Sequence, residues 1–264
     1  MAAKDTKHEF PLVSGNPRWQ GEQATGVYMD AFGSDALSLS CFPRTDAVRK
    51  WWTKMLEEEV QDPNASFSAT IAQDADGSSF SAFAKWVMPN PIDENQNAHT
   101  AAEAASAHAG IGPLHRSQDN PRWHVSQTTG NAFALPYLKE LPQWPDEPTS
   151  NHEAAASFFS RLLDIRKEWE TTLAPQFRSR GYYYLELIAV RSGHQGEGLG
   201  KRHLRWGLER AATEGLPVYL EASPKSVGFY ASEGFQIHST VWVNLGERGE
   251  FFNHCMVKMP ASAV

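Results

Sequence analysis

Three closely spaced glycines stand where an apolar run gives way to an amphipathic pattern. The run Tyr182–Val190 comes first, the sequence QGEGLG at positions 195–200 follows, and a helical periodicity begins near Gly198. Glycines at a helix start leave backbone amides uncovered at the positive end of the helix dipole, which favours a bound phosphate. The alternative is a flexible connector, although each glycine costs a helix about 1 kcal/mol relative to alanine. The spacing therefore favours a phosphate-binding turn.

Two widespread phosphate-binding motifs do not fit this turn. A P-loop needs Lys followed by Ser or Thr, whereas Lys201 is followed by Arg202, and Gln195 stands where its first glycine belongs. The dinucleotide fingerprint needs a third glycine three residues after the second, and that position is again Lys201. Both alternatives are therefore excluded.

The turn and two flanking segments resemble the GNAT superfamily of N-acetyltransferases. QGEGLG is similar to its acetyl-CoA motif Gln/Arg-x-x-Gly-x-Gly/Ala, and Ile188–Val190 resembles the Leu-Ala-Val strand that precedes this motif. YASEGF at 230–235 is similar to the family's Tyr-x-x-x-Gly-Phe block, in the expected order and separation. The segments YYYLELIAV, YLEAS, FYASEGF and LPQWP are most similar to those of uncharacterised fungal GNAT-domain proteins.

The resemblance implies that acetyl-CoA is the co-substrate and that no metal takes part. Amides of the glycine turn would hold the diphosphate, and strand residues would pair with the pantetheine arm. Ser223 stands where the family often has Asn, and Lys201 is either a phosphate contact or a solvated lysine. The implied cofactor-binding residues are Ile188, Ala189, Val190, Gln195, Gly196, Glu197, Gly198, Leu199, Gly200, Lys201, Ser223 and Phe229.

The resemblance also implies two catalytic residues. Tyr230 occupies the position whose hydroxyl can protonate the departing thiolate, with a core tyrosine as the alternative. Glu186 interrupts an otherwise apolar strand where related enzymes place a general base, and a substrate anchor or a structural ion pair is as plausible. Tyr184 and Glu221 are secondary candidates. Four tryptophans either line an acceptor pocket or pack in the core: Trp51, Trp52, Trp86 and Trp144.

Hydrophobic periodicity supplies the elements that must position these residues. It predicts helices over Gly21–Leu39, over Asp46–Val60 with Asp46 as N-cap, over Asn151–Thr172 with Asn151 as N-cap, and from Gly198 to a C-cap at Gly215. It predicts strands over Tyr182–Val190, over Val218–Ala222 and on both sides of a turn at Asp74–Gly77. The expected fold is a single α/β (α+β) domain over residues 1–264, with a GNAT-type mixed, mostly antiparallel, splayed central sheet flanked by helices.

Residues 90–148 do not fit this order of elements. The segment is rich in Asn, Gln, Ala, His, Ser and Pro, and only 101–109 has the composition of a short helix. A loop of this length is typical of a lid or of disorder, so we expect a long insertion within the domain. Five histidines in or beside it match no metal-ligand spacing: His99, His108, His115, His124 and His152.

The composition of the chain limits the kinds of partner and location that we expect. The net charge of −7 and the scattered acidic residues argue against a nucleic-acid partner. Two cysteines, Cys41 and Cys255, cannot form a disulfide framework, and no run of residues is apolar enough to span a membrane. We therefore expect a cytoplasmic protein, either a monomer or a homodimer.

These observations predict an acetyl-CoA-dependent N-acetyltransferase that acts on a small-molecule amine by direct transfer. Neither cysteine lies in a nucleophile motif, which disfavours a covalent acyl-enzyme. O-acetylation and longer acyl chains stay open. The alternative is a non-catalytic acyl-CoA-binding sensor or interaction module with the same fold.

Overall fold

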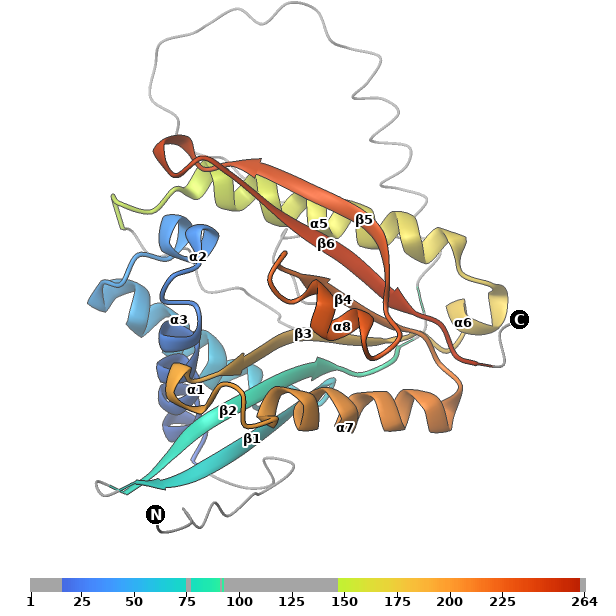
Figure 1. The fold of residues 1–264 in the computed structure, drawn as a ribbon, viewed down its shortest axis with the longest axis horizontal. Coiled ribbons are helices and arrows are strands. Elements are labelled where there is room, and N and C mark those ends of the chain that lie inside the picture. The colour runs from blue at the N-terminus through green and yellow to red at the C-terminus, as the bar shows by residue number, and fades with distance from the viewer. Residues whose placement is uncertain (1–15, 75–76, 91, 93–146, 262–264) are drawn as a thin grey trace, which may run out of the picture.

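The computed structural model describes residues 16–74, 77–90, 92 and 147–261, and one six-stranded sheet organises them (Figure 1). The strand order is β1-β2-β3-β4-β6-β5, and the β3–β4 pair is parallel while the other neighbours are antiparallel. The strands are β1 (Ala65–Asp74), β2 (Gly77–Val87), β3 (Tyr183–Val190), β4 (Val218–Ala222), β5 (Gln236–Asn244) and β6 (Glu250–Lys258). The predicted fold class, a mixed and mostly antiparallel sheet flanked by helices, is confirmed.

Seven α-helices are resolved in this part of the chain. They are α1 (Pro17–Ala31), α2 (Ala36–Cys41), α3 (Asp46–Glu59), α5 (His152–Thr172), α6 (Pro175–Arg178), α7 (Leu199–Glu214) and α8 (Val227–Ala231). Two short 3₁₀ helices, Ser192–His194 and Gly246–Arg248, lie in connections. Within the described ranges no helix has both the length and the apolar character needed to cross a membrane.

The sheet opens between its two parallel strands. β3 pairs with β2 as far as Val190, but with β4 only over Tyr183–Leu185 opposite Val218–Leu220. Among the described residues, the edge of 186–190 that faces β4 therefore has no strand partner. This opening is the predicted splay, and it lies directly before the glycine turn.

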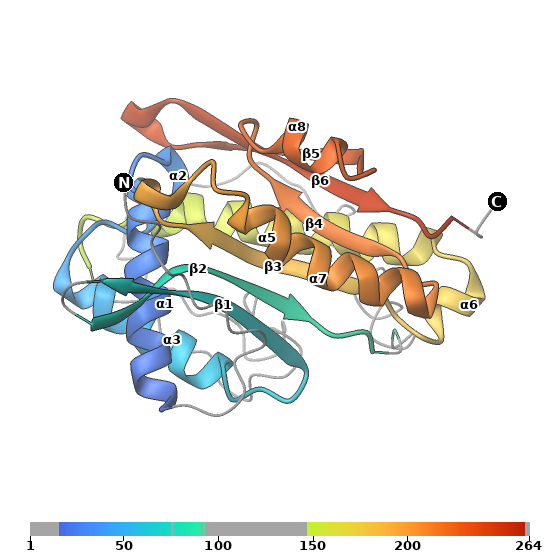
Figure 2. The same cartoon turned by 60° about the horizontal axis from the view of Figure 1, so that its bottom comes forward.

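Helices cover both faces of the sheet (Figure 2). Two adjacent residues of β2 show which helix lies on which face. Lys85 contacts Glu59 of α3, while Trp86 packs against Gly207 of α7. Because successive strand residues point to opposite faces, α3 and α7 lie on opposite sides. Tyr184 of β3 meets Arg166 of α5 on the α3 side.

α7 packs on the sheet through two unusual core residues. A Cβ atom at Gly207 would lie 2.3 Å from the Trp86 ring, so only glycine allows this approach. One turn earlier, His203 is fully buried, with Nδ1 2.7 Å from Ser68 Oγ and Nε2 3.1 Å from Thr70 Oγ1. These contacts fix the helix, and with it the glycine turn, against β1 and β2.

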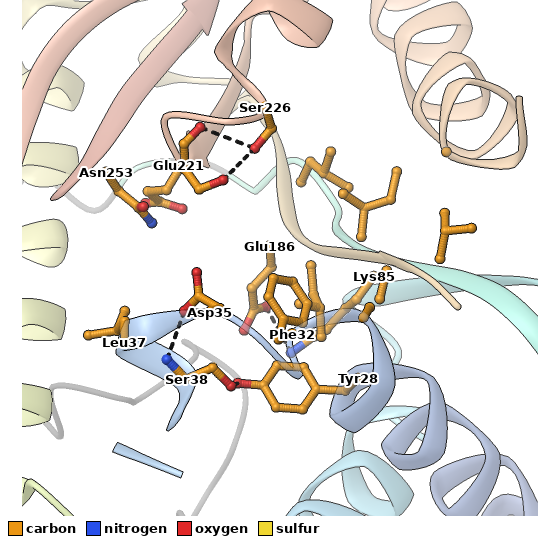
Figure 3. Close-up of a pocket in the computed structure, with 18 of the residues that line it drawn as sticks. Tyr28, Phe32, Asp35, Leu37, Ser38, Lys85, Glu186, Glu221, Ser226 and Asn253 are labelled. Carbon is orange, nitrogen blue, oxygen red and sulfur yellow. Dashed lines mark hydrogen bonds and ion pairs between the residues drawn. The ribbon is translucent and has the colours of Figure 1, made fainter. Parts of the chain in front are cut away.

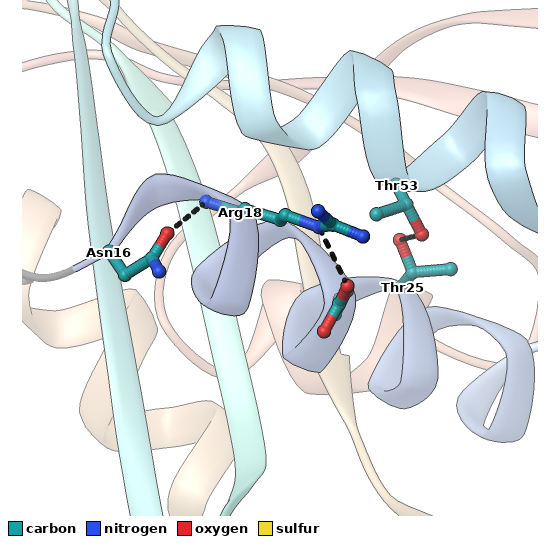
Figure 4. Close-up of polar contacts among 5 residues, drawn as sticks. Asn16, Arg18, Thr25 and Thr53 are labelled. Carbon is teal, nitrogen blue, oxygen red and sulfur yellow. Dashed lines mark hydrogen bonds and ion pairs between the residues drawn. The ribbon is translucent and has the colours of Figure 1, made fainter.

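α1 and α3 also pack closely (Figure 4). A Cβ atom at Gly21 would lie 2.8 Å from the Thr53 carbonyl oxygen, and Thr53 Oγ1 donates to Thr25 Oγ1 at 3.2 Å. α1 begins where the Asn16 side chain accepts a hydrogen bond from Arg18 N at 3.0 Å. The pair forms one wall of the site described below.

Two predictions about this region are wrong. Gly21–Leu39 is not one helix, because α1 ends at Ala31 and Asp35 starts α2 by accepting from Ser38 N at 2.8 Å. Asp46 is not the N-cap of α3. Thr45 takes that position with Oγ1 3.3 Å from Val48 N, and Asp46 is the first helical residue.

Other predicted boundaries are confirmed. Asn151 caps α5 by accepting from Ala154 N at 3.0 Å, and Gly215 ends α7 with a φ of 64°. Most of the predicted insertion lies outside the described residues, and so do the proposed helix at 101–109, His99, His108, His115, His124 and Trp144.

Candidate active site

A cavity of about 1640 Å³ lies where β3 and β4 diverge (Figure 3). Ligand pockets usually measure about 300 to 1,000 Å³, so this one has room for two reactants. Its wall includes most of the predicted site residues: Glu186, Ile188, Ala189, Val190, Gln195, Gly196, Gly198, Leu199, Gly200, Lys201, Ser223, Phe229 and Tyr230. The sheet opening thus brings together residues up to 44 positions apart, from 186 to 230.

The glycine turn has the backbone geometry that the sequence predicts. Gly196 and Gly198 have φ values of 84° and 81°, and a Cβ atom at either would meet nothing within 4 Å. Gly200 lies inside α7, where its Cβ would come 3.6 Å from the Val190 side chain. The first amides of a helix lack intrahelical acceptors, so the start of α7 presents free donors to the cavity.

The loop before this turn is held in place by its own contacts. Asp30 of α1 accepts hydrogen bonds from the backbone N and the Oγ of Ser192. Arg191 Nε donates to the Phe80 carbonyl oxygen at 2.6 Å, and Gln195 Nε2 donates to the Val190 carbonyl oxygen at 3.2 Å. The side chain of Gln195 therefore ties the loop to β3.

Two predicted cofactor-binding residues have other partners. Glu197 does not line the cavity, and its Oε2 lies 3.2 Å from His194 Nδ1. Lys201 lines the cavity, but its Nζ lies 2.6 Å from Glu233 Oε1. At these two positions the side chain already has a protein partner, so the backbone amide is the group left to bind a ligand.

Glu186 takes part in a buried charge cluster. Lys85 Nζ lies 2.8 Å from Glu186 Oε2 and 2.9 Å from Glu59 Oε1. The side chains of Lys85 and Glu59 are 1% and 4% exposed, whereas that of Glu186 is 21% exposed. Glu186 is thus the member of this triad that a substrate in the cavity reaches most readily.

A strand irregularity directs Glu186 to this position. Lys85 pairs with Leu187 and Trp86 with Leu185, so Glu186 is an extra residue without a partner on β2. Such a bulge bends the strand locally and re-aims its side chains. The bulge and the loss of pairing with β4 occur at the same point of β3.

A second carboxyl group lines the cavity on β4. Tyr184 Oη donates to Glu221 Oε2 at 2.9 Å, and the Arg166 guanidinium carbon lies 4.7 Å from the centre of the Tyr184 ring. Burial raises the pKa of Glu221 to about 7, although the charge of Arg166 and the Tyr184 hydrogen bond act in the opposite direction. Tyr184 and Glu221, the secondary candidates, are thus direct partners.

Tyr230 stands on α8 at the cavity wall. Its ring lies between Phe229, at a centroid distance of 4.9 Å, and Phe235, at 5.9 Å. Burial, with a smaller contribution from the Glu221 charge, raises the pKa of the Tyr230 hydroxyl well above its usual range. The hydroxyl therefore keeps its proton at neutral pH and can donate a hydrogen bond, although the raised pKa makes it a weaker acid than an exposed tyrosine.

Sequence reasoning missed several residues of the cavity wall, among them Glu59, Lys85, Arg166 and Asp35. Lys85 interrupts an apolar strand run as Glu186 does, and by this pattern Lys85 could have been recognised as a site residue. Glu59 follows Trp52 and Leu56 at helical spacing and so belongs to the buried face of α3.

The tryptophans divide between the two predicted roles. Trp51 and Trp52 line the cavity, whereas Trp86 is fully buried in the core. His152 also lines the cavity. Among the described residues, no group of three or more His, Cys, Asp or Glu side chains could hold a metal ion.

Residues 162–235 match the model of the acetyltransferase (GNAT) family. Over these residues the chain is similar to GNAT acetyltransferases. The matched residues run from the second half of α5 to the residue before β5 and contain β3, the glycine turn, α7, β4 and α8. The matched residues therefore include both catalytic candidates and every predicted cofactor-binding residue. The match supports an acyltransferase activity.

Solved structures with similarity to most of the chain include acetyltransferases. A structure described as histone acetyltransferase HPA2 and related acetyltransferase from Corynebacterium glutamicum is 16% identical, with a TM-score of 0.49, and the match covers 98% of this chain and 99% of that one. Polyamine N-acetyltransferase of Drosophila melanogaster is 13% identical, with a TM-score of 0.49 and coverage of 92% and 96%. Arylalkylamine N-acetyltransferase 2 from Aedes aegypti is 13% identical, with a TM-score of 0.47 and coverage of 97% and 99%. None of these likenesses assigns a substrate to this chain.

Proposed function

We propose that this protein transfers the acetyl group of acetyl-CoA directly to the nitrogen of a small-molecule amine. One observation carries the proposal: the unpaired edge of β3 and the free amides at the start of α7 line the same cavity as Glu186 and Tyr230. An acyl donor held along the first two surfaces would present its thioester to the second two. The match of residues 162–235 to the GNAT family supports this use of the cavity.

The donor would be held mainly by backbone groups. The amides of Gly196, Gly198 and the first turn of α7 would donate to the diphosphate, where the positive end of the helix dipole favours negative charge. The open edge of Ile188–Val190 would pair with the amides of the pantetheine arm as a further strand does. Ser223 and Phe229 would form the opposite wall of this channel.

The acceptor would be a cationic amine before it reacts. Glu186, Glu221 and Asp35 contribute carboxyl groups to the cavity wall, and Trp51 and Phe42 contribute aromatic surface. Carboxylates attract an ammonium group, and aromatic faces add to this attraction. Such a lining favours a small amine with apolar substituents.

The reaction would need one proton acceptor and one proton donor. The carboxylate of Glu186 would take the ammonium proton, and the neutral nitrogen would then attack the thioester carbonyl carbon. As the C–S bond breaks, Tyr230 would donate its proton to the departing sulfur. The nitrogen of the adduct would lose its second proton, which returns to the tyrosine oxygen through solvent, and Glu186 would release its own proton to solvent. Holding both reactants in one cavity can contribute roughly 7 to 11 kcal/mol to such a reaction.

Thiol release from acetyl-CoA across a panel of primary amines tests this function. We expect turnover with at least one cationic amine and a large loss of turnover in Glu186→Gln. Glu247→Gln is a suitable control, because Glu247 is an exposed residue of the 3₁₀ helix after β5, away from the cavity wall. Tight binding of acetyl-CoA without turnover on any amine would instead favour the non-catalytic sensor.

A further inference from the structure

The buried pair behind Glu186 has no role in the reaction as described so far. Lys85 lies between Glu59 and Glu186, with its Nζ within 3 Å of one oxygen of each carboxylate. One ammonium thus faces two carboxylates, and the fully charged triad carries a net charge of −1. Its three members come from α3, β2 and β3, so the fold itself assembles this charge.

We propose that Glu59, acting through Lys85, adjusts the proton affinity of Glu186 and makes it an effective base. The inference rests on the proposed function of the cavity. Glu59 and Lys85 are positioning residues, because their side chains are only 4% and 1% exposed at the cavity wall, whereas that of Glu186 is 21% exposed. Glu186 alone carries the proton to and from the cavity.

The argument follows from the cost of buried charge. Were Lys85 paired with Glu186 alone, the pair would be neutral, and adding a proton to Glu186 would leave an uncompensated ammonium in the interior. Because Glu59 shares Lys85, the triad becomes neutral when Glu186 accepts a proton. Burial then favours proton uptake and does not oppose it.

The direction of the Glu59 shift agrees with this account. Burial raises the pKa of Glu59 to about 7, opposed by Lys85 and reinforced by the charge of Glu186. Glu59 and Glu186 therefore compete for the one ammonium of Lys85.

Other charges face the triad from neighbouring elements. Asp62 acts on Glu59 from beyond the end of α3. On the cavity side, Tyr184 and Glu221 both interact with Glu186, and Arg166 of α5 compensates their charge. All of these groups remain in the variants below, so the variants isolate the triad.

Two substitutions within the triad should move the pH dependence of the reaction in opposite directions. Glu59→Gln removes one negative charge and leaves Lys85 to Glu186, so the acidic limb of the kcat/KM profile should shift to lower pH. Lys85→Met removes the ammonium, so the limb should shift to higher pH. A charge within a few ångströms of a carboxyl group corresponds to shifts of about one to two pH units.

Glu58→Gln is the matched control. It removes the same charge from the adjacent residue of α3, but Glu58 pairs with Lys54 at 3.9 Å on the exposed side of the helix. We expect no shift of the profile in this variant. Lys85→Met leaves two largely buried carboxylates without their ammonium, so this variant must first be shown to fold. If it does not fold, the pH profile of Glu59→Gln alone tests the proposal.

A carboxyl titration supplies a readout that does not depend on turnover. With ¹³C-labelled glutamate, the signal that disappears in Glu186→Gln identifies Glu186, and its midpoint should fall in Glu59→Gln and stay in Glu58→Gln. An unchanged midpoint would overturn the inference even in an active enzyme. A shifted midpoint in a protein without acetyl transfer would support the charge coupling and overturn the proposed function alone.

Discussion

The glycine turn can be tested by substituting the glycines at the two ends of α7. Gly198 and Gly215 both have positive φ, 81° and 64°, and a Cβ atom at either would meet nothing within 4 Å. Gly198→Ala and Gly215→Ala should therefore destabilise the fold by similar amounts, roughly 1 to 2 kcal/mol each. Only Gly198 lines the cavity.

The two variants should differ in their affinity for acetyl-CoA. A methyl group at position 198 would occupy the space in front of the first amides of α7 and displace a phosphate oxygen from one of them. A hydrogen bond to a charged group contributes about 1.5 to 3 kcal/mol, which corresponds to a loss of affinity of about 10- to 100-fold. Gly215→Ala should bind as the wild type does.

Calorimetric titration with acetyl-CoA, combined with thermal unfolding of both variants, measures these effects. Comparable losses of stability with a loss of affinity in Gly198→Ala alone would support a phosphate site at the start of α7. Wild-type affinity in Gly198→Ala, or an equal loss of affinity in Gly215→Ala, would refute the reasoning.

Three further predictions concern other parts of the molecule. Tyr230→Phe should lower kcat about 100- to 10,000-fold with little change in the Kd for acetyl-CoA, because only proton donation is lost; equal losses in both constants would indicate a structural role. Gly207→Ala should destabilise the protein by about 2 to 4 kcal/mol in chemical unfolding, since its Cβ would lie 2.3 Å from the Trp86 ring, whereas Gly228→Ala, with open space around the new atom, should be near neutral; similar stabilities would contradict the α7 packing. Burial raises the pKa of Glu221 to about 7, above the value near 4.3 of an unfolded glutamate, so its contribution to stability is present at low pH and is lost as the pH rises through 7. Melting temperatures at pH 5.5 and 8 should therefore differ less in Glu221→Gln than in the wild type, and an unchanged difference would argue against a buried carboxyl group at this position.

The sequence predicted the elements that obey local rules. Asn151 and Gly215 mark helix ends because capping depends on a few neighbouring residues, and the glycine turn was recognisable because positive φ selects glycine. The single helix predicted over Gly21–Leu39 failed for a local reason too. Its apolar spacing continues across the break, but Asp35 caps a new helix.

The charge cluster could not be predicted as a cluster, because it depends on pairing between distant strands and a helix. Lys85 and Glu186 lie 101 positions apart, and only the β2–β3 register with its bulge places them together. Glu59 joins them because α3 packs on the same face of the sheet. Lys85 and Glu186 each interrupt an apolar strand run, whereas the partnership of the three residues belongs to the tertiary structure.

A structure of the protein with bound coenzyme A tests the central claim most directly. The account predicts the diphosphate at the amides of Gly196–Lys201, the pantetheine arm along Ile188–Val190, and the thiol directed toward Glu186 and Tyr230. Coenzyme A bound elsewhere, with this cavity free of ligand, would contradict it.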